Sequence, residues 1–314
     1  MYGRPMDHVF LSGNQRSGKT LLQLILASHP EITISPGTNI IAKVLFEMPR
    51  NRPLSEDNLR KMRQVLQKDR KFKAWRIDHR AYQAHVAKYQ SVTTAEVVED
   101  IMKFFRDQTK PNARYLGNKK GGYCKDGDLV KRVFPRAKLV FMLRDARGAV
   151  SSMLETQPEH DLTSASLMWW MKARRIRELK QEFPSDVFVC RYEELVTDPE
   201  AMARSLCTFL GLEYAPEMLA KYQTNDAIRH RTDTTHHETY EAITTSMIAE
   251  WKEKLRPEQV EAIEGLLGSE LEKSGYTPVT KPATGLSLAR YRAIRAREYL
   301  EWRTGWEMKR LKMG

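Results

Sequence analysis

The chain has few cysteines and no long apolar segment. Its 314 residues include only three cysteines, Cys124, Cys190 and Cys207, too few for a disulfide framework. This scarcity favours a reducing compartment and predicts a cytoplasmic protein. No apolar run is long enough to cross a bilayer, and the polar N-terminus is not typical of a secretory signal. Cysteine and histidine do not occur at zinc-ligand spacing, so we predict no metal site.

Positive charge is in excess. The formal net charge is +12, and 41% of the residues are hydrophobic, an ordinary fraction for a globular protein. Such a surface attracts anions, among them nucleotides, nucleic acid, acidic glycans and anionic lipid. The same charge would also keep a protein soluble without any binding role. Charge by itself therefore does not choose among these classes of partner.

Short apolar runs alternate with helical patterns along the chain. Three continuous runs are typical of buried parallel strands: Val9–Leu11, Leu139–Leu143 and Val187–Cys190. Helical patterns occur at 21–26, from about 148, at 199–210 and at 257–275. This alternation predicts an α/β fold, a parallel sheet flanked by helices, with ligands bound where the strands end.

The segment from Gly13 to Thr20 reads GNQRSGKT and fits the phosphate-loop pattern G-x-x-x-x-G-K-T. It follows a predicted strand and opens a predicted helix, so backbone N–H groups and the helix N-terminus would cradle an anion. Lys19 would add charge and Thr20 a hydroxyl. In a Mg²⁺-ATP-dependent kinase, a second strand usually ends in an Asp that holds the metal. Here the second strand runs into Arg144, a cation.

Five segments resemble those of PAPS-dependent sulfotransferases, where PAPS is 3′-phosphoadenosine 5′-phosphosulfate. In chain order they are Arg16–Leu22 with Ser28–Glu31, Asn118-Lys119 ahead of Phe134–Lys138, Leu143–Ser152, Arg191–Val196, and Trp251–Pro257. The resemblance covers about 8–278 and is closest to the bacterial and tyrosylprotein branches. Gln15 stands where the family usually has proline, and Lys19 where it usually has threonine.

The resemblance implies a P-loop-like fold in one sulfotransferase domain over 1–278. It implies metal-independent transfer of sulfonate from PAPS to an acceptor hydroxyl or amine, leaving PAP. The implied catalytic residues are Arg16 and Lys119. The implied donor-binding residues are Arg16, Ser17, Gly18, Lys19, Thr20, Arg144, Ser152, Tyr192, Thr244 and Ser246. Of these, Arg144 and Ser152 would hold the 3′-phosphate and Tyr192 the adenine, whereas the role of Arg147 stays open.

No residue matches the general base of the family. The tyrosylprotein branch has a glutamate soon after its His-Pro-Glu segment, where this chain reads Ser35–Thr38 without a carboxylate. Glu47, Asp78, His79 and His85 are candidates. The missing glutamate argues against tyrosine as the acceptor.

Two regions concentrate basic residues. The predicted helical insert at about 45–115 falls on the acceptor side of the family's fold and contains Arg60, Lys61, Arg63, Lys68, Arg70, Lys71 and Lys73. It indicates either an anionic acceptor, such as a uronic-acid glycan or a phosphorylated small molecule, or a solvated helix face. Residues 279–314 are expected to form a linker and a basic helix. That helix would pack on the domain, form a homodimer contact or lie on an anionic membrane, and its acidic residues favour packing.

Two other function classes compete with the sulfotransferase. A Mg²⁺-ATP-dependent kinase would use the literal loop pattern and would need the metal. A polyanion binder without turnover would show salt-sensitive binding, but no nucleic-acid-binding motif is present, so nucleic acid is not an expected partner.

Overall fold

The computed structural model describes residues 6–50, 52–73, 75, 77–224 and 242–311. At its centre is a parallel five-stranded sheet in the order β2-β3-β1-β4-β5. The strands are β1 (Asp7–Gly13), β2 (Ile32–Ser35), β3 (Tyr115–Lys119), β4 (Lys138–Leu143) and β5 (Val187–Arg191). From β1 the chain passes to the edge strand β2, returns to β3 beside β1, and then builds β4 and β5 on the other side of β1. The carboxyl end of β1 is therefore the point where ligands bind in such sheets.

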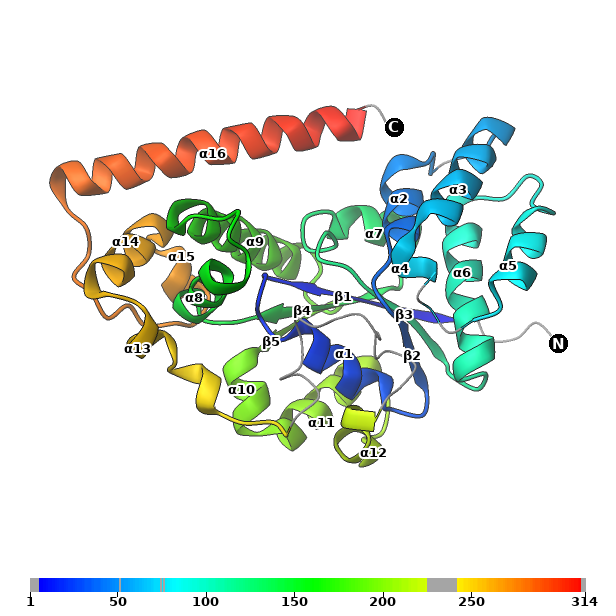
Figure 1. Cartoon of the computed structure of the whole chain (residues 1–314), viewed down its shortest axis with the longest axis horizontal. Coiled ribbons are helices and arrows are strands. Elements are labelled where there is room, and N and C mark those ends of the chain that lie inside the picture. Colours follow the sequence, from blue (N-terminus) through cyan, green and yellow to red (C-terminus); the bar gives the residue numbers. More distant parts are fainter. Residues whose placement is uncertain (1–5, 51, 74, 76, 225–241, 312–314) are drawn as a thin grey trace.

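Alternate residues of β1 face two different cores, as the two-residue period of a strand requires. Val9 and Leu11 pack into a core with α1 (Lys19–Ala27), α10 (Tyr192–Thr197) and α11 (Pro199–Leu210). Phe10 packs into the opposite core, which includes α2 (Asn39–Glu47), α6 (Thr94–Thr109) and α7 (Gly127–Val133). Figure 1 shows α1, α10 and α11 below the sheet and α7 above it.

The segment between α2 and α6 is helical. Between α2 and α6 lie α3 (Glu56–Lys68), α4 (Arg70–Lys73) and α5 (His79–Val86). Buried Asp69 joins this insert to the start of α2, because its Oδ2 accepts hydrogen bonds from the backbone N–H groups of Asn39 (2.7 Å) and Ile40 (2.9 Å). Burial opposes the ionisation of Asp69, but a hydrogen bond from the Thr38 hydroxyl together with these backbone bonds holds its pKa below the usual value.

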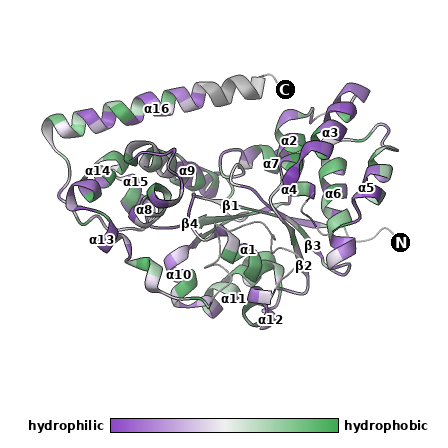
Figure 2. Ribbon diagram, in the orientation of Figure 1, coloured by the Kyte–Doolittle hydropathy of each residue, from purple (hydrophilic) through white to green (hydrophobic). Residues whose placement is uncertain are grey.

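A third core joins α8 (Ala146–Thr156), α9 (Leu162–Glu182), α13 (Trp251–Lys254), α14 (Pro257–Leu267) and α15 (Glu270–Lys273). The C-terminal α16 (Gly285–Leu311) crosses α9 and α14 (Figure 1). Arg295 Nη1 donates to the carbonyls of Gly265 (2.8 Å) and Leu266 (2.9 Å) at the end of α14. Polar and apolar residues alternate along α16 (Figure 2). Among the described residues, no helix combines the length and apolarity that crossing a membrane requires.

The structure corrects several predicted boundaries. The predicted single helix at 257–275 is wrong, because Gly268 has φ +56 and separates α14 from α15. The helix expected from about 148 begins at Ala146, since the Asp145 side chain accepts a hydrogen bond from Arg147 N (2.9 Å) and caps it. The strands β2 and β3 had not been predicted. Both are short and contain polar residues, so neither forms a continuous apolar run.

Candidate active site

The phosphate loop turns sharply between β1 and α1. Gly18 has φ +84, a conformation that favours glycine, and a Cβ there would lie 2.7 Å from Cδ2 of Tyr192. Ser17 Oγ donates to the carbonyl of Asn14 (2.8 Å), and Asn14 N donates to the carbonyl of Met142 on β4 (3.1 Å). The glycine therefore allows both the turn and the close approach of the tyrosine ring.

A cleft of about 510 Å³ opens over this loop at the carboxyl edge of the sheet. All the predicted catalytic and donor-binding residues line it. The other lining residues are Gln15, Leu21, Thr156, Gln157, Val196, Ala242, Ile243 and Met247. The lining contains four cations, Arg16, Lys19, Lys119 and Arg144, and its described part contains no Asp, Glu or His. Such a cleft suits a ligand with several negative charges.

Two lysines lie at the α1 end of the cleft. Lys119, at the end of β3, donates from Nζ to Thr20 Oγ1 (3.0 Å), whereas its neighbour Lys120 reaches away to Asn39 Oδ1 (2.6 Å). Lys19 donates from Nζ to the carbonyl of Asn14. Burial lowers the pKa of Lys19 well below its usual value, and the nearby cations, Lys172 first, lower it further.

The other end of the cleft holds Arg144 and Ser152. The Arg144 guanidinium lies 4.9 Å from the centre of the Tyr192 ring and donates to the carbonyls of Arg16 (3.2 Å) and Met247 (2.7 Å). Ser152 Oγ accepts a hydrogen bond from Arg16 Nε (2.9 Å). Residues predicted for opposite ends of the donor therefore touch across the cleft.

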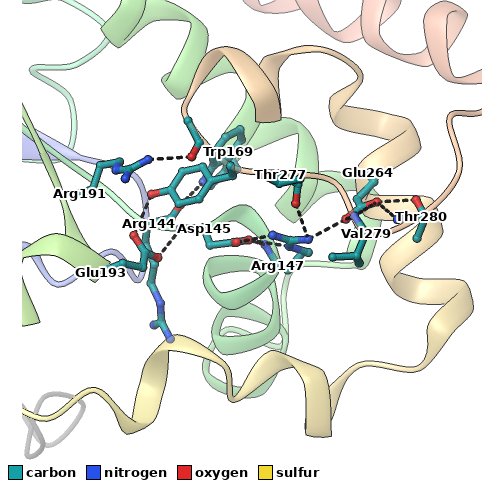
Figure 3. A network of polar contacts seen from close by, with 12 residues as sticks. Arg144, Asp145, Arg147, Trp169, Arg191, Glu193, Glu264, Thr277, Val279 and Thr280 are labelled. Carbon is teal, nitrogen blue, oxygen red and sulfur yellow. Dashed lines mark hydrogen bonds and ion pairs between the residues drawn. The ribbon is translucent and has the colours of Figure 1, made fainter. Parts of the chain in front are cut away.

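Arg147 lies outside the cleft, in a buried network that Figure 3 shows. Its guanidinium donates to Asp145 (Nη2 to Oδ2, 2.6 Å), to Glu264 (Nη1 to Oε1, 2.8 Å) and to the carbonyl of Thr277 (3.2 Å). It also lies 4.3 Å from the centre of the Trp251 ring. The structure thus gives Arg147 a packing role, and of these two arginines only Arg144 lines the cleft.

The family model named "Sulfotransferase family" matches residues 8–216. The chain belongs to the sulfotransferase family. It is a transferase of sulfonate groups, and the kinase alternative is not supported.

Several known proteins are similar to this sulfotransferase. Protein-tyrosine sulfotransferase 2 of Gallus gallus is 30% identical over 225 residues, which are 69% of this chain but only 54% of that protein. Protein-tyrosine sulfotransferase 1 of Danio rerio is 25% identical over 302 residues, 90% of this chain and 76% of that protein. This chain thus spans about half of the first relative's length and about three quarters of the second's.

Two solved structures share the fold. The sulfotransferase domain of the Synechococcus PCC 7002 olefin synthase has a TM-score of 0.63 at 18% identity, over 87% of this chain and 96% of that one. The sulfotransferase domain of the curacin biosynthetic pathway has a TM-score of 0.56 at 17% identity, over 88% and 99%. These likenesses support the predicted α/β fold.

The prediction of a cytoplasmic location is wrong. Relatives that match 90% of the chain are protein-tyrosine sulfotransferases, and these enzymes are not cytoplasmic. That prediction was based on the scarcity of cysteine. A low cysteine count means that few disulfides can form, but it does not identify the compartment of the protein.

None of the four candidate bases lines the cleft. Asp78 caps α5, the His79 ring contacts a backbone carbonyl one turn earlier, and His85 Nε2 lies 2.9 Å from Asp100 Oδ1. Glu47 is exposed near the end of α2. The sulfotransferase therefore has no assigned base among these residues. Within the described part of the chain, His, Cys, Asp and Glu form no cluster that would hold a metal ion.

Two residues near the loop were not among the predicted site residues. Gln15 lines the cleft, and Lys172 on α9 donates from Nζ to Gln15 Oε1. The departure of Gln15 from the family's proline was a signal that it has a special position. Lys172 lies in a helix 157 residues away, and no motif pointed to it.

Proposed function

We propose that Arg16 and Lys119 stabilise the leaving side of PAPS during transfer, while Arg144 and Ser152 hold its 3′-phosphate. The acceptor oxygen attacks sulfur, the bond from sulfur to the bridging oxygen breaks, and the electron pair stays on the 5′-phosphate of PAP. Fixed cations stabilise that developing charge. The cation-lined cleft, free of acidic side chains in its described part, is the single observation that best supports these roles.

Loop residues Ser17 to Thr20 would surround the 5′-phosphate at the start of α1, where backbone N–H groups and helix dipole favour an anion. Tyr192 would lie against the adenine, and Thr244 and Ser246 would close over the 3′-phosphate from the other wall. PAPS in this orientation would contact both ends of the cleft. This orientation also requires the Arg16–Ser152 hydrogen bond of 2.9 Å to open when the donor binds.

We infer further that the acceptor carries a negative charge near its hydroxyl. Asp69 holds basic α4 against the start of α2, beside the end of β3. There the pKa of Lys120 is lowered by burial and then by the positive charge of Lys71. Two neighbouring lysines at the end of β3, next to the cleft-lining Lys119, favour an anionic acceptor. The relatives named for protein tyrosine make a phenol the first hydroxyl to try.

Calorimetry with PAP and ATP, in EDTA and then in Mg²⁺, tests the donor site. We expect PAP to bind without metal and Arg144→Ala to lose that binding, since it removes the proposed 3′-phosphate contact. ATP binding that needs Mg²⁺, with no binding of PAP, would overturn the proposal.

Turnover of a phenol with a carboxylate, compared with its neutral amide, tests the acceptor. The phenol with the carboxylate should be turned over faster than its amide. The double variant Lys71→Met/Lys120→Met should remove this difference without changing the affinity for PAP. Equal turnover of both phenols by the unaltered enzyme would reject an anionic acceptor.

A further inference from the structure

The loop of this sulfotransferase carries a side-chain amide where its family usually has proline. Gln15 lines the cleft directly before Arg16, the proposed catalytic cation. Lys172 reaches the loop from α9 and donates a hydrogen bond from its ammonium group to Oε1 of Gln15. This contact joins the loop to α9.

The chemistry of lysine fixes the orientation of this amide. A glutamine side chain has one accepting oxygen and one donating nitrogen, and it can flip to exchange them. An ammonium group only donates hydrogen bonds, so Lys172 binds Oε1 and leaves the two N–H groups of Nε2 for another partner. A flipped amide would place two donors against each other. Lys172 therefore orients Gln15 so that its Nε2 group donates hydrogen bonds to a ligand in the cleft.

The surroundings show which part of a ligand this donor would meet. The charges of Lys172, Lys119 and Arg16 all act on Lys19, so these cations gather around the start of α1. Lys172 itself contacts a neutral oxygen, and burial lowers its pKa. Cations gathered in a partly buried place become more stable when an anion binds beside them. In the proposed orientation, that anion is the sulfonate end of PAPS.

We propose that Gln15 is a further catalytic residue whose Nε2–H groups bind the sulfonate oxygens, and that Lys172 is the positioning residue that orients it. The inference rests on the proposed function. Donors fixed on the sulfonate oxygens would hold sulfur in line with the attacking oxygen during transfer. No new chemical step is added, because the amide exchanges no proton with the substrate.

PAP lacks the sulfonate and so provides an internal control. Calorimetry with PAP and PAPS, in the absence of acceptor, gives the ratio of the two dissociation constants. Gln15→Ala should weaken PAPS about tenfold or more, as expected for a lost hydrogen bond to a charged group, and should leave PAP within about twofold. Gln15→Glu keeps an oxygen for Lys172 but loses the N–H donors, so PAPS should weaken at least as much without a loss of thermal stability.

Lys172 is tested by the same ratio. Lys172→Met releases the amide and should shift the ratio in the same direction, whereas Lys273→Met, on the exposed surface of α15, should not. Because Lys172 acts through Gln15, the double variant Gln15→Ala/Lys172→Met should change the ratio no more than Gln15→Ala alone.

Two outcomes overturn the inference. The first is an unchanged ratio of the two dissociation constants in Gln15→Ala, whether both ligands keep their affinity or lose it equally, while the unaltered enzyme binds both. That result would leave the proposed function intact. The second is a fully additive double variant, which would refute the positioning role of Lys172. Failure of the unaltered enzyme to bind PAP would instead reject the proposed function, and the inference with it.

Discussion

Replacing Arg147 should destabilise this sulfotransferase far more than replacing Arg144, although the two arginines are near neighbours in the sequence. The Arg147 side chain is 5% exposed and lies between the carboxylates of Asp145 and Glu264. Glu264 in turn accepts hydrogen bonds from Val279 N (3.0 Å) and Thr280 N (2.8 Å), as Figure 3 shows. Arg147→Met would therefore leave two carboxylates without their cation and weaken the hold on the C-terminal segment.

The size of the effect follows from the charges left behind. Removing one partner of a buried ion pair costs about 3–5 kcal/mol, because the other charge stays buried without compensation. That is a large part of the roughly 5–15 kcal/mol by which domains are stable. Arg144 instead donates to two backbone carbonyls, which are neutral. Arg144→Met should lower the free energy of unfolding by only about 1–2 kcal/mol and should abolish PAP binding.

Urea denaturation followed by fluorescence measures both free energies of unfolding. Arg147→Met/Glu264→Gln serves as a control, because it removes one of the two uncompensated charges and should recover part of the loss. Equal stability of Arg147→Met and Arg144→Met would refute the reasoning. So would PAP binding that survives in Arg144→Met, since the two arginines would then not have separate roles.

Three other predictions concern the loop and the ion pair between β1 and α6. PAP binding at alkaline pH should take up protons, because the bound anion raises the depressed pKa of Lys19; calorimetry in buffers of different ionisation enthalpy detects this uptake, and Lys19→Met should abolish it. Gly18→Ala should cost about 1–2 kcal/mol of backbone strain and should also lose PAP binding, because its Cβ would lie 2.7 Å from the tyrosine ring beneath the loop. In Gly211→Ala, with φ +66 and open space around its Cβ, only the strain should appear, as urea denaturation would show. The His8 ring holds the pKa of Glu99 at about 2. The negative charge of Glu99 therefore adds stability that is present above about pH 4.3 and is lost as the pH falls toward 2. Denaturation at several pH values should show Glu99→Gln less stable at pH 6 and the difference shrinking below pH 4; a constant difference would contradict this linkage.

The local parts of the site could be predicted from the sequence. The loop from Gly13 to Thr20 was predicted because glycine spacing, the preceding strand and the following helix are properties of adjacent residues. Arg144 was predicted because its segment, Leu143–Ser152, resembles one of the family and follows an apolar strand. The residues of the predicted donor site could therefore be identified without a structure, and all of them line one cleft.

Contacts between distant segments were decided by the tertiary structure. Arg147 and Glu264 are 117 residues apart, and Gln15 and Lys172 are 157 apart, so no local pattern relates them. The order of strands around β1 brings such segments together, and buried charges then pair according to the side chains that packing places beside them. The sequence by itself determined that this chain has a phosphate-loop pattern and that cations follow its strands. Only the fold decided which arginine lines the cleft and which one holds the core together, because both are buried and their partners, not their residue type, separate them.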